Sequence, residues 1–344
     1  MNALLDPAIL FFAVGLAAGL LRSDLEIPAQ ISRFLSLYLL MALGLKGGFA
    51  LAESGLTAGI IASLIAAVLM AIIVPLLGYA GLRHSVSRYD AAAIAASYGS
   101  VSAVTFLTAA QYLADLGWPA GGHMAVALVL MESPAILIAV FIANTLRQKA
   151  NSAGSGLAAA RVSANGPSAT AASVAGSPAS VRLGHILHES LTNGSHLLLI
   201  GALAIGMLSG ESGKAVMRPF SDDLFKGMLA FFLLDMGLSV ARNLADARRA
   251  PPLLVLYAVI APIVHASIAL GLAWLLRLPA PDTALLMVLS ASASYIVVPA
   301  VLRHAIPEAN PALYCGLSLG ITFPINLLAG IPAYSWLAQR VMAG

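Results

Sequence analysis

Apolar runs of about twenty residues follow one another along almost the whole chain and are separated by short polar turns. Runs of this length suit helices that cross a membrane, because about twenty helical residues span the hydrocarbon core. The expected fold is an all-α polytopic membrane protein with ten transmembrane helices. Their approximate ranges are 7–21, 30–48, 56–82, 90–116, 123–146, 186–209, 223–240, 252–276, 282–303 and 312–342.

The stretch 147–185 does not share this pattern. It is rich in Ala, Ser, Gly and Pro with scattered Arg, and it shows no apolar periodicity. Such composition is typical of a flexible linker, and the length would be unusual for a loop inside a compact domain. We therefore expect it to join a first five-helix unit, 1–146, to a second one, 186–344.

Two of the apolar runs are interrupted by polar residues at matching places. The first interruption is SYGSVSAVT at 97–105, and an offset of 192 residues lays Ser100 on Ser292 and Ser102 on Ser294. Serines at membrane depth are tolerated where they line a cavity or bond a backbone that has left regular helix. Paired breaks in two halves of a chain are typical of a transporter's binding site. The alternative is that these small residues only let helices pack closely.

Other positions repeat at nearly the same spacing. The matches are DAA at 90–92 with DTA at 282–284, LGL at 43–45 with MGL at 236–238, and Pro134 with Pro324. An odd number of helices in each half would make the second half enter the membrane from the opposite side. The two five-helix repeats are therefore expected to be inverted.

Composition excludes a soluble protein, since 60% of the residues are hydrophobic, only 10% are charged, and the mean hydropathy is +0.92. The net charge of +3 does not indicate nucleic-acid binding here, because the basic residues lie mostly at helix ends. Twelve Lys and Arg residues fall on the side of the linker and six on the other side. This bias predicts that both termini lie outside and the linker lies in the cytoplasm. The expected location is a bacterial inner membrane.

Enzymatic and metal-binding signatures are missing from the sequence. Cys315 is the one cysteine, so no internal disulfide can form, and the seven histidines show no metal-ligand spacing. No G-x-S-x-G elbow or phosphate-binding loop stands between a strand and a helix. We therefore predict that the protein is not an enzyme and has no metal centre.

The interruptions suggest a chemistry of their own. A helix that resumes at membrane depth presents free backbone N–H groups and a positive dipole end, which suit a small anion. Serine hydroxyls and released carbonyls beside it suit a sodium ion. Two facing breaks would form one closed site, which favours a cation-coupled carrier of a small anion without naming that anion.

Ionisable residues inside the apolar runs are a second set of candidates, because each is unfavourable in hydrocarbon unless it faces protein or water. Asp235 and Glu132 could each bind a cation or carry a proton. The alternative for Asp235 is a pair with a neighbouring helix, for example through His265, which we expect to be a hydrogen-bonded packing residue. For Lys46 we favour a side chain that extends to the membrane interface over one that binds substrate.

Five stretches of the chain resemble the cyanobacterial-type sodium-dependent bicarbonate permease family. They are LGLKGG at 43–48, GSVS at 99–102, HESL at 188–191, IAPIVH at 260–265, and LR followed by IPEANP within 302–311. The resemblance covers nearly the whole chain outside the linker. It implies two inverted repeats, a core domain with two broken helices, a gate domain and commonly a trimer. It also implies bicarbonate and sodium between the breaks, and a PII-type regulatory protein on the cytoplasmic side.

The resemblance assigns candidate site residues by position. For the anion they are Ser102, Ala103, Val104, Thr105, Ser292, Ser294 and Tyr295, followed by Val297 and Val298 in the second break. For the cation we add the ionisable candidates, which gives Ser100, Ser102, Ser294, Asp235 and Glu132.

The chain departs from the family pattern at both breaks. Cyanobacterial members have SGST where this chain has SAVT at 102–105, and SDISGP where it has SYIVVP at 294–299. An acid and two hydroxyls are thereby replaced, and the lost carboxylate is a strong oxygen ligand for a hard cation. Tyr295, at the position of the acid, could supply a hydroxyl or fill the vacated space.

These features predict a secondary transporter for sodium-coupled uptake of bicarbonate, with sodium as the coupling ion. One alternative is a symporter of another small anion or carboxylate, driven by sodium or by protons through Asp235 or Glu132. Another is a membrane receptor that binds an anion without moving it. The expected partners are the small anion, membrane lipid, further copies of the chain and a PII-like regulator, and not nucleic acid.

Overall fold

The computed structural model describes residues 6–55, 57–162 and 194–342, and every regular element within these ranges is helical. Seven stretches of this part of the chain are long and apolar enough to cross a membrane, and α1 and α11 are shorter apolar helices. The first half contains α1 (Pro7–Leu20), α2 (Ala29–Ser54), α3 (Ala58–Leu82), α4 (Arg88–Gly99), α5 (Ala103–Asp115) and α6 (Met124–Val162).

The second half begins with α8 (Gly194–Arg218), which a π-type turn, η2 (Pro219–Asp223), joins to α9 (Phe225–Arg248). It continues with α10 (Pro252–Leu275), α11 (Ala280–Ala291) and α12 (Val297–Ala305). A final helical segment, 311–342, is built from α13 (Pro311–Leu317), η3 (Ser318–Thr322), α14 (Phe323–Ile325), η4 (Asn326–Gly330) and α15 (Ile331–Met342).

The ten apolar runs of the sequence correspond to these helices, with some differences at their ends. The largest difference is in α6, which continues past the expected end at 146 to Val162. Alanine and arginine, which dominate 157–162, are good helix formers and let the helix continue outside the apolar run. The rest of the expected linker, the start of the sixth run and the HESL stretch at 188–191 lie outside the described residues.

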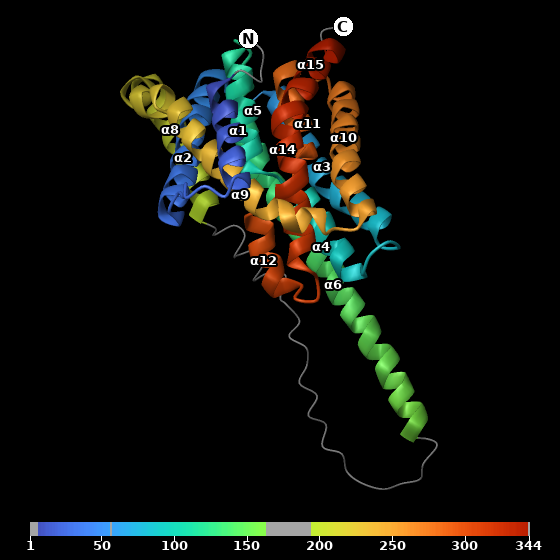
Figure 1. Ribbon diagram of the computed structural model, residues 1–344. Coiled ribbons are helices and arrows are strands. Elements are labelled where there is room, and N and C mark those ends of the chain that lie inside the picture. The colour runs from blue at the N-terminus through green and yellow to red at the C-terminus, as the bar shows by residue number, and fades with distance from the viewer. Residues whose placement is uncertain (1–5, 56, 163–193, 343–344) are drawn as a thin grey trace.

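The helices form two units that lie side by side in Figure 1. In the four-helix unit, α1 packs along α9 and α2 packs along α8. The six-segment unit consists of α3, α4 with α5, α6, α10, α11 with α12, and the final segment 311–342. Within it, α3, α4 and α6 pack together, and α10, α11 and α15 pack together. Two cavities lie where these units meet, because α2 and α9 line both of them together with α5 and α6.

Glycines allow the close helix crossings of the four-helix unit. A Cβ atom on Gly44 of α2 would lie 2.6 Å from the carbonyl oxygen of Leu199 in α8. A Cβ atom on Gly237 of α9 would lie 2.2 Å from the carbonyl oxygen of Phe12 in α1. Because neither distance is possible for a real side chain, both positions require glycine. These are the two glycines that the LGL and MGL matches align.

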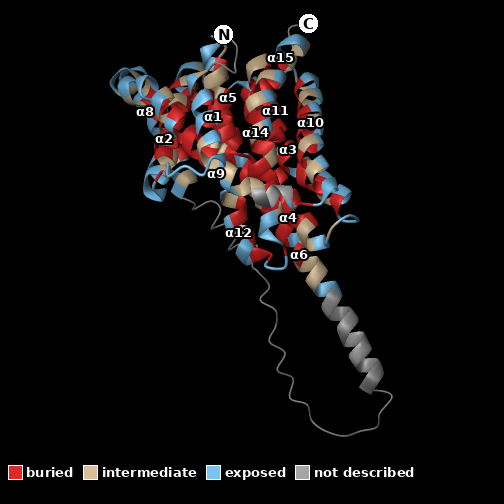
Figure 2. Cartoon of the chain, viewed as in Figure 1, coloured by how far each residue is buried: buried red, intermediate tan, exposed pale blue. Residues whose placement is uncertain are grey.

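The broken helices run through the middle of the six-segment unit. Every residue of α4 from Ala91 to Gly99 is buried, and so is every residue of α11 from Asp282 to Ala291. Figure 2 shows this buried interior, with exposed residues gathered on outward surfaces. Figure 1 shows the two chain ends at one end of the bundle and the far end of α6 at the other.

Candidate functional site

The first break separates α4 from α5. Ser100 has an extended backbone (φ −95°, ψ −178°), and α5 starts again after Ser102, whose hydroxyl accepts a hydrogen bond of 3.2 Å from the N–H of Thr105. Gly99 is required at the end of α4, because a Cβ atom there would lie 2.6 Å from the ring of Pro75 in α3. The end of α4 therefore packs directly against a proline of the neighbouring helix.

The second break separates α11 from α12 at the same register. Both α4 and α11 have 12 residues, and the starts and ends of the two helices differ by 192 positions. Ser292 is extended (φ −79°, ψ 166°), and the hydroxyl of Ser294 accepts a hydrogen bond of 3.3 Å from the N–H of Val298. The offset found in the sequence therefore aligns the two helix ends.

The two breaks bond directly to each other. The N–H of Ser294 donates to the carbonyl oxygen of Ser97 at 2.7 Å, and the N–H of Ser102 donates to the hydroxyl of Ser292 at 3.0 Å. The Ser292 hydroxyl in turn donates to the carbonyl oxygen of Leu289 at 2.8 Å. Backbone groups that leave the helices at membrane depth are satisfied across the crossing, as they must be away from water.

A small cavity lies beside this crossing. Its volume is about 80 Å³, which is room for several water molecules or one small anion. It is lined by Ser36, Leu40, Val101, Ser102, Ala103, Val104, Leu107, Leu128, Glu132, Ser195, Leu199, Phe232, Ser294, Tyr295, Ile296 and Val297. Both units contribute, since α2, α8 and α9 face the two breaks and α6.

The structure places the sequence candidates in two groups. Ser102, Ala103, Val104, Ser294, Tyr295 and Glu132 line the cavity. Thr105 and Ser292 are buried and do not line it: the N–H of Thr105 donates to the Ser102 hydroxyl that caps α5, and the Ser292 hydroxyl links the two breaks. Ser100 is buried with a hydroxyl that has no hydrogen-bond partner among the described residues.

Asp235 lies outside this cavity. It is buried on α9 and accepts a short hydrogen bond from the hydroxyl of Ser32 in α2. The partner of this acid is therefore Ser32 and not His265, which is buried on α10 with an Nδ1 that has no partner in the described part of the chain. A serine was not identifiable as the partner from the sequence, because spacing does not report which helix lies opposite.

Tyr295 occupies the position at which the family pattern has an acid. Its hydroxyl lies 3.4 Å from the hydroxyl of Ser102 and 3.8 Å from the sulfur of Met236. Its ring packs against Phe323, with the ring centroids 5.3 Å apart. The side chain thus fills the space next to the first break and directs a hydroxyl toward it.

Three contributors to the site are not among the residues that the sequence patterns single out. Ser36 and Ser195 line the cavity from α2 and α8. Asn326 donates a hydrogen bond of 2.7 Å to the carbonyl oxygen of Ala291, which the second break leaves without its helical partner. A buried Asn in an apolar run was the one available signal, since a buried amide needs hydrogen-bond partners.

The loops that follow the two broken helices are held by a reciprocal pair of carboxylates. Asp90, in the first turn of α4, accepts a hydrogen bond of 2.7 Å from the N–H of Asn310, in the loop after α12. Asp282, in the first turn of α11, accepts one of 2.8 Å from the N–H of Gly121, in the loop after α5. Asp282 also lies 3.2 Å from Nε2 of His123.

The chemistry available in the cavity is that of helix ends, hydroxyls and one carboxyl group. The first N–H groups of α5 and α12 have no acceptor within their own helices, and the positive ends of both dipoles favour an anion. The hydroxyls of Ser102 and Ser294 and the carboxyl group of Glu132 are oxygen ligands of the kind that sodium prefers. Among the described residues, no group of three or more His, Cys, Asp or Glu side chains could hold a metal ion.

Comparison with protein families identifies the one to which this chain is similar. A family model of the Na⁺-dependent bicarbonate transporter superfamily matches residues 7–339. No curated protein aligns significantly with the chain. The match covers both helical units and both breaks, and the apolar helices agree with a transmembrane transporter. By this match, which spans nearly its whole length, the chain belongs to the Na⁺-dependent bicarbonate transporter superfamily.

Proposed function

We propose that the protein is a secondary transporter, and not an enzyme, that couples the uptake of bicarbonate to the entry of sodium. The observation that carries this proposal is the crossing of the two breaks, where two helix N-termini and two serine hydroxyls meet at one cavity of about 80 Å³. Membership of a bicarbonate transporter family supports the choice of anion.

In this proposal, the anion binds at the start of α5 and α12. The N–H groups of Ala103, Val104 and Val297 are the donors that no helical acceptor occupies. The hydroxyls of Ser102 and Ser294 complete the anion site. Ser292 acts from behind, because its hydroxyl joins the two breaks, and Thr105 stays a predicted substrate-binding residue whose N–H is bonded to the Ser102 hydroxyl.

Sodium would bind beside the anion with oxygen ligands. Ser102 and Ser294 provide hydroxyls, and Glu132 provides the carboxylate that the family pattern would place at Tyr295. The hydroxyl of Ser100, which has no hydrogen-bond partner among the described residues, is a further candidate at the first break. Asp235 stays a predicted cation ligand, and it would have to act from outside this cavity.

A second candidate is coupling to protons through Glu132. This acid is 6% exposed and lines the cavity, while the position of the family's acid holds a tyrosine. A buried carboxyl group facing a substrate cavity is a typical proton carrier in transporters. The two candidates differ in which ion gradient drives uptake.

We also propose that the two five-helix halves are inverted repeats, with both termini outside a bacterial inner membrane. The equal lengths of α4 and α11 support the repeat, and the two chain ends lie at the same end of the bundle in Figure 1. The charge bias supports the orientation. A trimer and a PII-like regulator stay predictions from the family resemblance.

The test is uptake of labelled bicarbonate into proteoliposomes, with a sodium gradient, a proton gradient or neither. Uptake that rises only with the sodium gradient is the expected result. Uptake that follows the proton gradient alone would favour coupling through Glu132. An absence of uptake under all three conditions would contradict the proposal and favour another solute or an anion receptor.

Substitutions test the site itself. Ser102→Ala and Ser294→Ala should each lower uptake by about tenfold, because each removes a hydroxyl that lines the cavity. Ser267→Ala is the matched control, since that exposed hydroxyl on α10 bonds only the carbonyl oxygen of Ile263. Unchanged uptake in both site variants, at normal expression, would remove these serines from the proposed site.

A further inference from the structure

A second cavity lies in the same interface as the site, nearer the end of the bundle that holds the chain termini. It has a volume of about 190 Å³. Lys46 provides its one charged side chain, and Gln111 is the other long polar one. The remaining lining residues are hydrophobic residues, glycines and one proline, and they include Leu43, Phe106 and Phe225.

The two cavities are stacked along the same three helices. On α2 the lining passes from Leu40 at the site to Leu43 at the second cavity, and on α6 it passes from Leu128 to Ala125. On α5 it passes from Leu107 to Ala110. Each step is about one helical turn, or roughly 5 Å, so the second cavity continues the path from the site.

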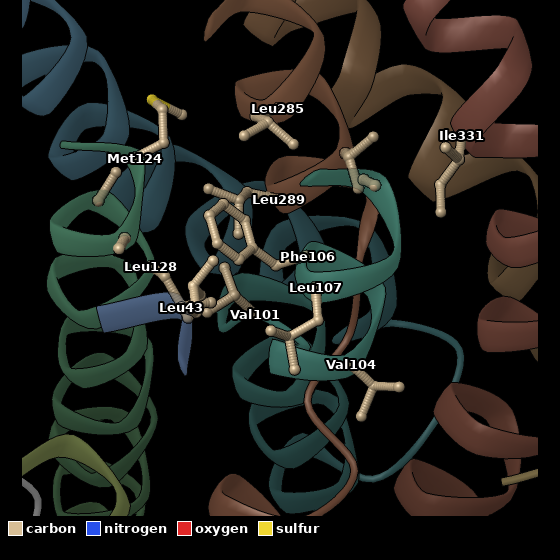
Figure 3. Packing of buried hydrophobic residues seen from close by; sticks show 14 of the residues in the cluster. Leu43, Val101, Val104, Phe106, Leu107, Met124, Leu128, Leu285, Leu289 and Ile331 are labelled. Carbon is tan, nitrogen blue, oxygen red and sulfur yellow. The ribbon is translucent and has the colours of Figure 1, made fainter. Parts of the chain in front are cut away.

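Buried apolar side chains close this path. Leu43, Phe106 and Leu128 all belong to the main hydrophobic cluster and are at most 8% exposed. Figure 3 shows Leu43 of α2 meeting Val101 beside the first break, with Phe106 and Leu128 around them. A hydrated ion cannot cross such a layer unless α2 and α5 move apart. We call Leu43, Phe106 and Leu128 the apolar seal.

Lys46 stands directly beyond the apolar seal, one turn of α2 after Leu43. Its side chain is 31% exposed, and Nζ lies 3.0 Å from Oδ1 of Asp222 in η2. Nζ also lies 4.3 Å from the ring centroid of Phe225, which lines the same cavity. An ammonium group has three N–H donors, and Asp222 accepts one of them.

Two other lysines near this end of the bundle differ from Lys46. Lys214 has two carboxylate partners, Glu53 and Glu211. Lys226 also has two, Asp6 and Asp115. Lys46 has one carboxylate among the described residues and faces a cavity, so its charge is the least compensated of the three.

We propose that Lys46 captures the anion in the second cavity before it passes the apolar seal, and that Asp222 is the competitor that the anion displaces. This inference rests on the proposed transport of bicarbonate and adds a waiting position to it. The single positive charge raises the local concentration of a small anion, while the adjacent carboxylate keeps binding weak enough for release.

Opposite shifts in KM for bicarbonate uptake test this exchange. Lys46→Met should raise KM by roughly three- to tenfold and leave the maximal rate within about twofold, because the site itself is untouched. Asp222→Asn should lower KM, since the competitor for the ammonium group is gone. Lys214→Met is the matched control, because it breaks a similar ion pair that faces no transport cavity, and its KM should not change.

The outcomes separate this inference from the proposed function. If the wild-type protein takes up bicarbonate but Lys46→Met and Asp222→Asn shift KM in the same direction or not at all, the pair is only a structural ion pair and the capture step is wrong. If the wild-type protein takes up no bicarbonate, the proposed function fails, and the capture step fails with it.

Chemical rescue provides a second readout at the same position. In a Cys315→Ala background, Lys46→Cys should show the high KM of Lys46→Met. Reaction with an aminoethyl methanethiosulfonate adds a positive charge of nearly lysine length and should restore the low KM. Reaction with the methyl reagent adds no charge and should restore nothing. Equal effects of the two reagents would show that side-chain volume matters at this position and charge does not.

Discussion

The two breaks begin at equivalent positions, 192 residues apart, but they differ in length and in how far they are buried. The first spans 100–102 and is fixed on both sides, by Pro75 against Gly99 and by the Ser102 hydroxyl that caps α5. The second spans 292–296 and contains an exposed side chain, Ile296, at 55% exposure. It leads into the shorter helix α12.

This difference indicates that the two breaks contribute to the site in different ways. We expect the short, closely packed first break to hold its N–H donors in place, and the longer, more exposed second break to adjust to the ligand. The following predictions test the comparison, starting with the largest expected effect.

Gly99→Ala should lower the stability of the protein most. The new methyl group would overlap the Pro75 ring, so the helix ends must separate, and the expected loss is about 3 kcal/mol of stability or more. The equivalent change in the second break, Ala291→Gly, should lower stability by only about 1 kcal/mol. Thermal unfolding of the purified protein in detergent measures both.

A glycine in an open position provides the control for Gly99→Ala. A Cβ atom on Gly81 of α3 would meet no atom within 4 Å, so Gly81→Ala should be neutral or slightly stabilising. If Gly99→Ala unfolds at the wild-type temperature, the contact with Pro75 does not fix the first break.

Ser292→Ala should have the next largest effect. It removes the acceptor for the buried N–H of Ser102, and an unsatisfied buried donor costs about 1–3 kcal/mol. Ser100→Ala, its equivalent by the 192-residue offset, removes a hydroxyl without a partner in the described chain and should leave the unfolding temperature nearly unchanged. Thermal unfolding of the two variants measures this difference in stability.

The same pair of variants can be compared in transport. If Ser100 binds sodium as predicted, Ser100→Ala should require more sodium for half-maximal uptake while its unfolding temperature stays the same. A variant with normal stability and normal sodium dependence would show that the Ser100 hydroxyl has no part in cation binding.

The smallest expected effect concerns the loop after α12. Arg147 donates to both carboxylate oxygens of Glu308, at 2.8 and 2.7 Å, and this hydrogen bonding holds the pKa of Glu308 below its ordinary value of 4.5. A lowered carboxylate pKa stabilises the fold above that ordinary value, and the contribution is lost as the pH falls through the folded-state pKa.

Glu308→Gln should therefore lower stability at neutral pH by no more than about 1 kcal/mol, because the pair is partly exposed to solvent. The difference between variant and wild type should shrink as the pH falls below about 4.5. Unfolding curves at several pH values measure it. A constant difference at all pH values would mean that the ion pair is not its cause.

Sequence patterns could predict the positions of the breaks, since serines and glycines inside apolar runs are visible without any structure. They could also predict that two helices match, because α4 and α11 begin and end at the offset of 192 residues. They could not predict which residues bond to each other across helices or which residues meet at the cavity. Ser32 bonds Asp235 across 203 residues, and Ser36 and Ser195 approach the cavity from helices whose hydropathy says nothing about their neighbours.

The roles of single residues were harder to predict from the sequence than the positions of the breaks. Lys46 has the pattern of a side chain that extends to the membrane interface, and only the cavity next to it suggests another role. The Ala-rich part of α6 has a composition that suits a linker and a helix equally well, because composition alone does not fix the conformation of small residues.

The reciprocal carboxylates, Asp90 and Asp282, have a consequence for biosynthesis. Each broken helix is anchored to a loop that belongs to the opposite half of the polypeptide. When only the first half has been synthesised, the loop that holds its broken helix is therefore not yet present. Final folding must wait for the second half, and two halves made as separate polypeptides would be expected to find each other in the membrane.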